Sequence, residues 1–344
     1  MSRLYLVTGA AGHLGNTVIR QLCEAGQAVR ALVLPGDKAA DELPPQVQVF
    51  RGDVRSKPSM ELFFNIGNQE ATVIHCAGIV SIASGFQQAV YDVNVTGTKN
   101  IVALCEARNV KKLVYVSSVH ALPVLPQGEM MREVTEFDPK NVTGAYAKTK
   151  AEATAAVLKA AGHSLNISVV HPSGICGPFD YGSSHTTQLV LDGCTGKLAA
   201  GVKSGFDFVD VRDVAAGIIS CCQEGRAGEC YILSNRYVSV SEIFSILHKV
   251  TGTKEIKAML PMWFAKLTAP AAEFYYKLRK QLPLYTPYSL LTLSGNSLFS
   301  SEKAAKELGY KARPFIETIA DTASWLVSQK RLSLPKLKLA TLKV

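Results

Sequence analysis

The sequence predicts an α/β protein with a doubly wound parallel sheet and a smaller, mostly helical lobe after it. Two observations carry this prediction. A short apolar run, residues 4–7, is followed by the glycine-rich segment 8–15 and then by apolar residues at helical spacing over 16–25. After that, short apolar runs alternate with helical segments as far as about residue 180. This alternation is typical of parallel sheets, because each helix returns the chain to the start of the next strand.

The glycine-rich segment joins the first strand to the first helix. Its glycines, Gly9, Gly12 and Gly15, follow the spacing G-x-x-G-x-x-G. A bare backbone lets a pyrophosphate approach the helix N-terminus, where unpaired N–H groups and the helix dipole favour an anion. An ordinary tight turn is the alternative interpretation, and the combination of strand, loop and helix favours a dinucleotide site over it.

The remaining elements follow from the same patterns. Further strands are expected at 28–34, 47–50, 71–74, 112–116 and 167–170, with helices over 90–107 and 146–158. Beyond Gly182 we expect short strands at 206–209 and 230–233 among helices near 211–222, 239–250, 261–280, 301–308 and 314–327. We therefore expect a nucleotide-binding domain over 1–180, to which residues of about 205–235 return, a substrate-binding lobe over 181–330 and a basic tail over 331–344.

The end of the second strand bears on the choice of dinucleotide. An acid there would accept hydrogen bonds from an adenosine ribose and exclude a 2′-phosphate. No acid occurs over 25–36, Leu34 stands at the usual place, and Arg30 is a nearby cation. Both NAD and NADP stay open, with NADP slightly favoured. After the third strand, Asp53 is suited to an adenine amino group or to capping a helix expected from Pro58, and the two roles are compatible.

A tyrosine and a lysine share one face of the helix predicted over 146–158. Tyr146 and Lys150 are spaced i and i+4, and the fifth strand delivers Ser117 and Ser118 to the same sheet edge. A phenol with a pKa of about 10 is a poor base at neutral pH, but an adjacent ammonium and an oxidised nicotinamide both favour its anion. Tyr146 can then take a proton from an alcohol, or give one to a carbonyl in reverse, while Ser118 holds the reacting oxygen.

Together these segments resemble the extended short-chain dehydrogenase/reductase superfamily from residue 4 to about residue 326. The shared motifs are Thr8-Gly9-x-x-Gly12-x-x-Gly15, Gly52-Asp53-Val54, His75-Cys-Ala-Gly78, Val93-Asn94-Val-Thr-Gly-Thr98, Ser117-Ser118, Tyr146-x-x-x-Lys150, Pro172-x-x-x-x-Gly177-Pro178 and Phe208-Val-Asp-Val-Arg-Asp213. The resemblance implies a Rossmann-type domain, an NAD or NADP cofactor, and a catalytic set that we place on Ser118, Tyr146 and Lys150, with Ser117 as the fallback.

The resemblance also implies cofactor contacts along the glycine loop and the strand ends. We assign them to Gly9, Ala11, Gly12, His13, Leu14, Gly15, Arg30, Leu34, Asp53, Val54, Cys76, Ala77, Gly78, Asn94, Val116, Ser117, Tyr146, Lys150, Pro172, Ser173, Gly174 and Ile175.

Within the superfamily, the chain is more similar to the 3β-hydroxysteroid dehydrogenase and dihydroflavonol-4-reductase-like branch, which implies hydride transfer at a carbonyl or secondary alcohol of an apolar ring substrate. Apolar and aromatic residues over 259–264, 274–276 and 282–285 would suit the wall of such a pocket, or the core. Two positions depart from the branch. His171 stands where an arginine is common, and Leu34 stands where an NADP-binding arginine is frequent.

Two alternatives remain. A nucleotide-sugar epimerase or dehydratase is one, although sugar-nucleotide members usually follow the serines with Tyr-Gly and here Val119 and His120 follow; the acidic pair of dehydratases is missing as well. A non-catalytic NAD(P)-sensing regulatory protein is the other. Such sensors typically lose the Tyr/Lys pair, which this chain keeps.

Composition excludes some functions. The net charge of +9 is dispersed except in the tail from Lys330 to Lys343, so we expect no nucleic-acid partner. That tail alternates lysine with leucine, but such ends are more often loosely packed than membrane-bound, and we expect no membrane contact.

Eight cysteines without C-x-x-C pairs predict a reduced, cytoplasmic protein, and the absence of H-x-x-x-H predicts no metal site. The family often pairs through helices of the cofactor domain, which makes a homodimer plausible.

Overall fold

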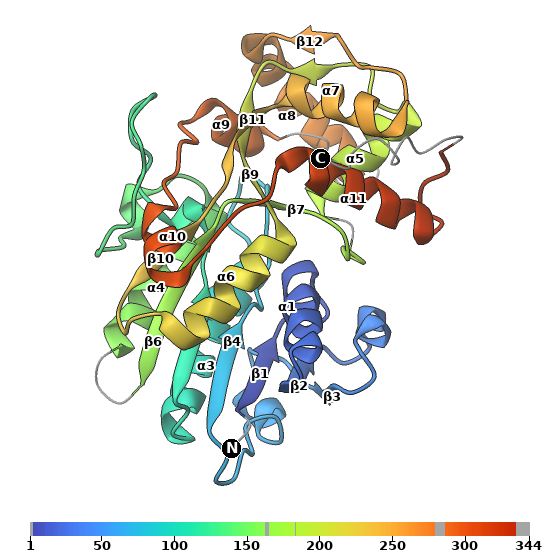
Figure 1. The fold of residues 1–344 in the computed structure, drawn as a ribbon. Helices are drawn as coiled ribbons and strands as arrows, with labels where there is room; N and C mark the ends of the chain where they lie inside the picture. The colour runs from blue at the N-terminus through green and yellow to red at the C-terminus, as the bar shows by residue number, and fades with distance from the viewer. Residues whose placement is uncertain (1–2, 162–164, 183, 279–285, 335–344) are drawn as a thin grey trace.

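The computed structural model describes residues 3–161, 165–182, 184–278 and 286–334, with the side chains of 272–278 outside that description. A seven-stranded parallel sheet forms its centre (Figure 1). The strand order is β10 (Cys230–Leu233), β6 (Asn166–Pro172), β5 (Lys112–Val116), β4 (Ala71–His75), β1 (Leu4–Thr8), β2 (Ala28–Val33) and β3 (Gln48–Arg51).

The order of the strands fixes where a ligand can lie. Strand β1 pairs in parallel with β2 on one side, where Leu4 faces Ala28, and with β4 on the other, where Leu4 faces Ala71. Since the chain winds outward in both directions from β1, a crevice opens at the carboxyl ends of β1 and β4. The doubly wound sheet predicted from the alternation of strands and helices is confirmed.

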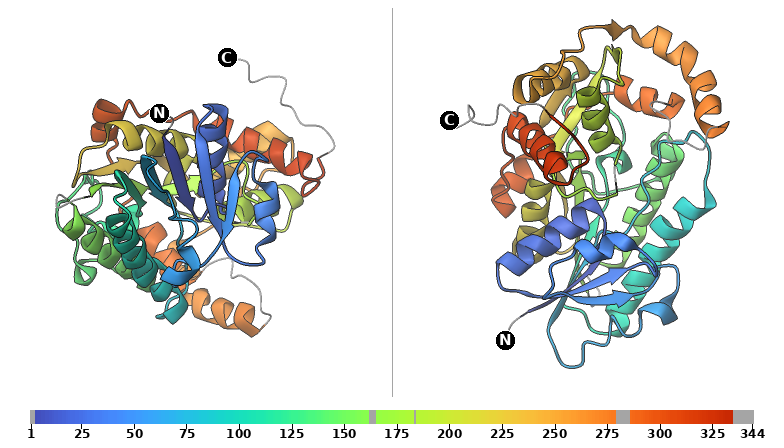
Figure 2. Two further views of the ribbon diagram at one scale, coloured as in Figure 1. Left: turned by 90° about the horizontal axis from the view of Figure 1, so that it is seen from below. Right: turned by 90° about the vertical axis from the view of Figure 1, so that its right-hand side faces the viewer.

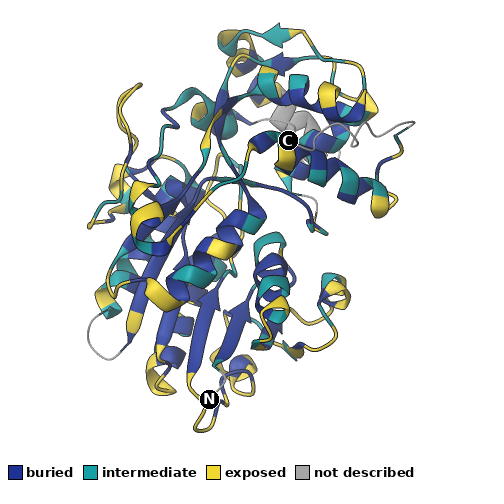
Figure 3. Ribbon diagram, in the orientation of Figure 1, coloured by how far each residue is buried: buried dark blue, intermediate teal, exposed yellow. Residues whose placement is uncertain are grey.

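Helices cover both faces of this sheet, as the views of Figure 2 show. The first face carries α1 (His13–Glu24), α6 (Val211–Glu224) and α10 (Glu302–Leu308), whose buried Val18, Ile218 and Leu308 share one core with the sheet. The second carries α3 (Thr98–Ala107) and α4 (Ala145–Ala160), which contribute Ile101 and Val157 to the other core. The strands between them are largely buried, except for the edge strand β3, which is mostly exposed (Figure 3).

A lobe of helices and short strands lies beyond the carboxyl ends of the sheet (Figure 1). Its strands are β7 (Gly174–Cys176), β9 (Gly205–Asp210) and β11 (Arg236–Ser239) in one sheet, and β8 (Gly201–Val202) with β12 (Met259–Leu260) in another. Its helices are α5 (His185–Thr195), α7 (Val240–Thr251), α8 (Met262–Leu278), α9 (Pro287–Ser294) and α11 (Phe315–Ser328). Phe244, Leu247, Ile319 and Trp325 form the core between α7 and α11.

Several local elements differ from the sequence expectations. The helix expected from Pro58 is a single 3-10 turn, η2 (Lys57–Met60). The helix expected over 90–107 is divided into α2 (Gln88–Tyr91), the π-helical turn η3 (Asp92–Gly97) and α3. Helices α5 and α9 were not predicted, and the last two residues of the helix expected over 261–280 lie outside the described residues. Further 3-10 turns are η1 (Lys38–Glu42), η4 (Val119–Ala121) and η5 (Pro139–Asn141).

Across the part of the chain that the structure describes, no helix is both long and apolar enough to span a bilayer.

Candidate active site

The three glycines of the first loop have different structural roles. Gly9 has a φ of +64°, and a side chain there would lie 2.6 Å from the backbone nitrogen of Ala77. A side chain at Gly15 would overlap the carbonyl of Gly9. Gly12 is exposed, and its nearest obstacle is the Gly9 oxygen at 3.2 Å. Packing of the chain itself therefore requires Gly9 and Gly15, whereas Gly12 leaves bare backbone open toward a ligand.

The N-terminus of α1 is free to bind an anion. Its N-cap, Gly12, makes no side-chain capping hydrogen bond, and the first turn carries no acid. These N–H groups and the positive end of the helix dipole fit a pyrophosphate. His13 is tied to the Pro178 carbonyl at 2.8 Å, and burial lowers the pKa of its ring, so it adds no charge there. Ala11 is buried beneath the loop and Leu14 is half-buried in the first turn.

The end of β4 lies beside the lysine of α4. Cys76 and Ala77 are half-buried and Gly78 is exposed. A side chain added at Gly78 would lie 3.3 Å from Asn94 Oδ1 and 3.4 Å from Lys150 Nζ. The structure thus brings together predicted site residues from three segments, and a side chain at Gly78 would press on both Asn94 and Lys150.

The π-helical turn η3 positions Asn94. Its Oδ1 accepts a hydrogen bond from the Ile79 backbone nitrogen at 2.8 Å, and its Nδ2 donates to the Ile79 carbonyl at 3.0 Å and to Thr149 Oγ1 at 3.1 Å. Asn94 therefore fixes the loop that follows β4 against α4. The sequence pattern of a continuous helix did not reveal this turn, although such turns are frequent at functional sites.

The structure distinguishes the two serines after β5. The hydroxyl of Ser118 lies close enough to the Tyr146 phenol to favour its charged form and so to lower its pKa. Ser117 is buried on the other side, where its Oγ shares a hydrogen bond with Thr154 Oγ1 at 2.7 Å. Ser118 Oγ also accepts from the His120 backbone nitrogen at 3.2 Å, which anchors it to the turn η4. Only Ser118 therefore shares the surroundings of Tyr146.

Tyr146 and Lys150 are both buried, on consecutive turns of α4. Lys150 Nζ donates to the Val116 carbonyl at 2.9 Å, and burial lowers the pKa of its ammonium to about 8. Burial raises the pKa of the Tyr146 phenol above its usual value, and the nearby Ser118 hydroxyl opposes that shift. The phenol in this structure is consequently protonated at neutral pH, which suits it to give a proton to a carbonyl.

An aromatic wall that the sequence did not predict adjoins the phenol. The ring of His120 meets Tyr146 edge-on at 5.9 Å and stacks on Phe206 at 5.5 Å. Phe206 in turn contacts Phe299 at 6.1 Å. Burial lowers the pKa of His120 to about 4, so its ring is neutral. The position of His120 two residues after Ser118 was a usable sequence signal, whereas Phe206 and Phe299 come together only in the fold.

Helix α9 closes over the start of α4. Gly144, with a φ of +104°, lies against the ring of Tyr288, and any side chain there would overlap that ring. At the N-terminus of α9, Thr286 Oγ1 donates to the Ile82 carbonyl at 2.6 Å. The lobe is thereby attached to both sides of the crevice, through residues that no sequence motif marks.

The segment after β6 is held by the small sheet of the lobe. His171 Nδ1 lies 3.0 Å from the Ser118 carbonyl, and its ring stacks on Phe137. The Ser173 hydroxyl donates to Asp207 Oδ1 at 2.5 Å. In the register of β7 against β9, Gly174 faces Phe208 and Ile175 faces Val209. Pro172 ends β6 next to this segment, so the four residues 172–175 follow the carboxyl end of the sheet.

At the expected adenosine end of the site, the cation that approaches Leu34 is Arg51 and not the predicted Arg30. Arg30 Nη1 donates to the carbonyls of Phe63 at 3.3 Å and Asn65 at 2.9 Å, and it is not brought to Leu34. Leu34 is instead approached by Arg51, whose Nη1 lies 3.5 Å from its carbonyl oxygen. No sequence motif marks Arg51 as a candidate for this position, although it is the last residue of β3.

The carboxylate of Asp53 is held by hydrogen bonds from Arg55. Its carboxylate accepts from the Arg55 side chain at 2.6–3.0 Å and from the Arg55 backbone nitrogen at 2.9 Å, so it caps this turn and not the helix expected from Pro58. The pKa of Asp53 is lowered, chiefly by these Arg55 hydrogen bonds. Val54 is buried against Gly97 of η3.

The expected apolar wall of the lobe is only partly described. Met259 and Leu260 are half-buried, whereas Trp263 is 67% exposed and Phe264 is 39% exposed. The side chains of 274–276 and the whole of 282–285 lie outside the described residues.

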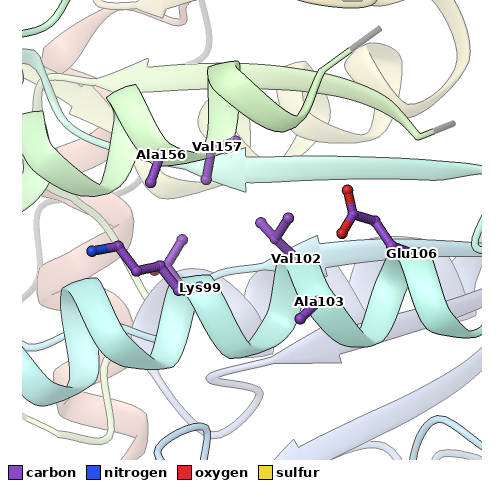
Figure 4. A pocket seen from close by; sticks show the side chains of 7 residues that line it. Lys99, Val102, Ala103, Glu106, Ala156 and Val157 are labelled. Carbon is purple, nitrogen blue, oxygen red and sulfur yellow. The ribbon is translucent and has the colours of Figure 1, made fainter. Parts of the chain in front are cut away.

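A hollow of about 150 Å³ lies between the outer faces of α3 and α4 (Figure 4). Lys99, Val102 and Glu106 of α3 face Ala156 and Val157 of α4 across it. It includes none of the predicted site residues, so it is not the substrate site. A homodimer through helices of this domain stays a prediction.

Comparison with known proteins agrees with this geometry. The model of the NAD dependent epimerase/dehydratase family matches residues 5–234. Sterol demethylase protein B of Methylococcus capsulatus is 29% identical over 326 residues, which cover 93% of this chain and 97% of that protein. A putative dihydroflavonol 4-reductase of Synechocystis sp. is 28% identical over 336 residues, covering 94% and 95%.

Among solved structures, gox2253 superposes with a TM-score of 0.82 at 28% identity, covering 96% of this chain and 99% of its own. The UDP-glucose 4-epimerase of Thermotoga maritima shares the fold, with a TM-score of 0.74 at 19% identity over 95% of this chain and 99% of its own. The chain belongs to the NAD-dependent epimerase/dehydratase family, and it is an enzyme of the extended short-chain dehydrogenase/reductase type.

Proposed function

We propose that this enzyme reduces a ketone, or oxidises the corresponding secondary alcohol, on an apolar ring substrate of the steroid or flavonoid kind. The observation that carries the proposal is the buried Tyr146 phenol, which Ser118 adjoins, beside the stacked rings of His120 and Phe206. A buried acid/base next to aromatic rings is suited to a carbonyl on a flat apolar skeleton. The names of the sterol demethylase and dihydroflavonol reductase relatives support the same substrate class.

In the proposed reaction, Ser118, Tyr146 and Lys150 each have a separate role. Bound nicotinamide donates or accepts the hydride. Ser118 orients the reacting oxygen, and Tyr146 gives that oxygen a proton during reduction or takes one during oxidation. Lys150, held by the Val116 carbonyl, places a positive charge beside the bound cofactor and favours the tyrosinate that remains after proton donation. The buried walls exclude water from the proton transfer.

The nucleotide-sugar alternative predicts a different wall. A sugar nucleotide is polar along its length and needs hydrogen-bond partners around the sugar, whereas the neighbours of Tyr146 include the stacked rings of His120 and Phe206. The regulatory alternative predicts loss of the acid/base pair, and both Tyr146 and Lys150 are present and buried at the site. We further propose a cytoplasmic enzyme, in line with eight cysteines that are all free.

The experiment is to follow NADH and NADPH absorbance with a panel of ketosteroids, flavanonols, simple ketones, the reverse alcohols and nucleotide sugars. Oxidation of either cofactor by an apolar ketone is expected. Tyr146→Phe should then lower kcat by about 10³-fold, because the proton donor is lost, and should leave cofactor affinity unchanged. Turnover of a nucleotide sugar alone, or unchanged turnover by the Phe variant, would overturn the proposal.

A further inference from the structure

Helix α8 buries small side chains and exposes large apolar ones, which is the reverse of what a helix packed on a protein core does. Its described side chains that face the protein are small: Ala265 is 1% exposed and Ala269 is 0% exposed. Its large apolar side chains face outward, with Trp263 at 67%, Phe264 at 39% and Leu267 at 72% exposure. A helix that stabilised the lobe would bury its large apolar face and expose its polar one. The sequence, judged from its tail, predicts no membrane contact; we propose instead that this outward face of α8 docks the enzyme on the surface of an anionic lipid bilayer.

The outward residues form one continuous surface on the helix. At 100° per residue, Trp263, Leu267 and Phe264 fall within about a third of the helical circumference, and Ala265 and Ala269 lie on the opposite side. Lys266 borders the apolar strip and is exposed. This order, an apolar strip with a tryptophan and a flanking lysine, is that of helices that lie in a membrane interface. In both views of Figure 2, α8, drawn in orange, lies at the periphery of the lobe.

The charges around α8 fit an anionic surface. Over 249–271 the chain has four lysines and one acid, Glu255, which is paired with Lys257 at 3.5 Å. Lys254, Lys257 and Lys266 are exposed, and so is Lys203, whose backbone nitrogen bonds the Leu260 carbonyl two residues before α8 begins. Each cation near an anionic leaflet contributes about 1 kcal/mol to attraction.

A second copy of the chain is a poorer occupant of this surface. In a two-fold dimer the same patch meets itself, so the lysines around one α8 would face the lysines around the other. Like charges across an interface oppose association. Lipid headgroups of opposite sign avoid this, and the lysine side chains can reach the headgroups while their stems rest on apolar surface.

Docking through α8 would place the active site close to the bilayer. Ala265 and Ala269 of α8 pack with Leu290 of α9. Helix α9 in turn carries Tyr288, which lies against Gly144 at the start of α4. An apolar substrate dissolved in lipid would therefore meet the enzyme at the side of the lobe that leads to Tyr146. The docking itself does not depend on the proposed reaction.

The two tryptophans make the test direct, because Trp263 is exposed and Trp325 is buried. In full-length Trp325→Phe protein, Trp263 is the remaining reporter. Vesicles of phosphatidylcholine with phosphatidylglycerol should shift its emission to the blue and should sediment the protein, and pure phosphatidylcholine should do both more weakly. Trp263→Ser/Leu267→Ser should weaken vesicle binding by at least about tenfold. The matched control Val49→Ser/Leu62→Ser removes exposed apolar residues elsewhere, 43% and 73% exposed, and should bind like the parent.

Three results would overturn the proposal. Equal vesicle binding by the α8 variant and the parent protein would show that α8 is not the contact. Loss of binding only when Lys336, Lys338 and Lys343 of the tail are changed to glutamine would assign the contact to the tail. A dimer in vesicle-free buffer that the α8 variant converts to monomer, with no vesicle binding by the parent, would assign the surface to a second copy. Circular dichroism and cofactor titration confirm that each variant is folded.

Discussion

The cofactor side of the crevice and the C-terminal lobe are held together in different ways. At the cofactor side, two glycines of the first loop are constrained by backbone: Gly15 lies against Gly9, and Gly9 against Ala77. In the lobe, α8 rests on two alanines and exposes its tryptophan, and α9 reaches the site through a single ring against Gly144. The first region is specified by its own packing. The second exposes apolar surface whose partner lies outside the chain.

This difference between the cofactor side and the lobe indicates that substrate specificity can change in the lobe more easily than cofactor binding can change in the glycine loop. A cofactor common to a whole family requires the same close backbone approach in every member, so the loop tolerates little. A substrate lobe needs only to cover the crevice and present suitable rings. We expect substitutions at the cofactor side to cost stability and those at the lobe to cost mainly substrate recognition.

The largest effect expected within this contrast is at the glycine loop. Gly15→Ala should lower the free energy of unfolding by about 3 kcal/mol, because the new methyl group overlaps backbone of Gly9 that cannot move aside. Gly12→Ala is the matched control and should cost less than about 1 kcal/mol, yet weaken cofactor binding. Urea unfolding and cofactor titration measure both. Equal stability losses at the two positions would contradict the different roles assigned to them.

The next effect separates the two serines. Ser118→Ala should lower kcat by about 10²-fold, because the reacting oxygen loses the hydroxyl that orients it. Ser117→Ala should leave kcat almost unchanged but lower the free energy of unfolding by about 1 kcal/mol, since the Thr154 hydroxyl keeps its bond to the Lys150 carbonyl but loses its second buried partner. Steady-state kinetics and denaturation of both variants provide the check. The reverse pattern of rates would place the catalytic hydroxyl on Ser117.

A smaller effect tests how the lobe is joined to the sheet. Burial raises the pKa of Asp207 to about 6, although the hydrogen bond from Ser173 opposes this. The folded protein thus binds this proton more tightly than the unfolded chain, whose aspartate titrates at about 3.9. The resulting stabilisation is complete below about pH 4 and is lost as the pH rises through about 6.

Asp207→Asn should consequently raise the free energy of unfolding at pH 8 by about 2 kcal/mol and flatten its dependence on pH between 4 and 6. The asparagine oxygen can still accept the hydrogen bonds from Ser173 and from the Asn235 backbone nitrogen. Thermal unfolding across this pH range is the measurement. A variant less stable at pH 8 would show that the charged carboxylate is the favoured form.

The smallest effect concerns the cofactor. If a 2′-phosphate binds beside Leu34, Arg51 is the cation that meets it, so Arg51→Gln should raise the KM for NADPH about tenfold and leave that for NADH unchanged. Arg30→Gln, the matched control, should change neither KM by more than about twofold, because the Arg30 guanidinium bonds Phe63 and Asn65. Equal changes in the KM values for NADPH and NADH would mean that Arg51 does not bind the 2′-phosphate.

The sequence by itself determined the sheet, the glycine loop and the family. These features depend on local order along the chain: an apolar run, a glycine spacing, and a tyrosine and lysine on one helical face. It also favoured Ser118 over Ser117, and in the structure Ser118 adjoins the Tyr146 phenol whereas Ser117 bonds Thr154. The roles of these residues in catalysis stay predictions.

Only the tertiary structure decided which cation approaches Leu34, which rings adjoin Tyr146 and which face of α8 is exposed. Arg30 and Arg51 both lie near strand ends in the sequence, and the register of β2 with β3 decides which of them reaches Leu34. Phe206, Tyr288 and Tyr146 are far apart along the chain, so no periodicity could join them. The sequence of α8 shows where its apolar residues lie along the helix. Ala265 and Ala269 pack inward, and this packing turns the large apolar side chains outward.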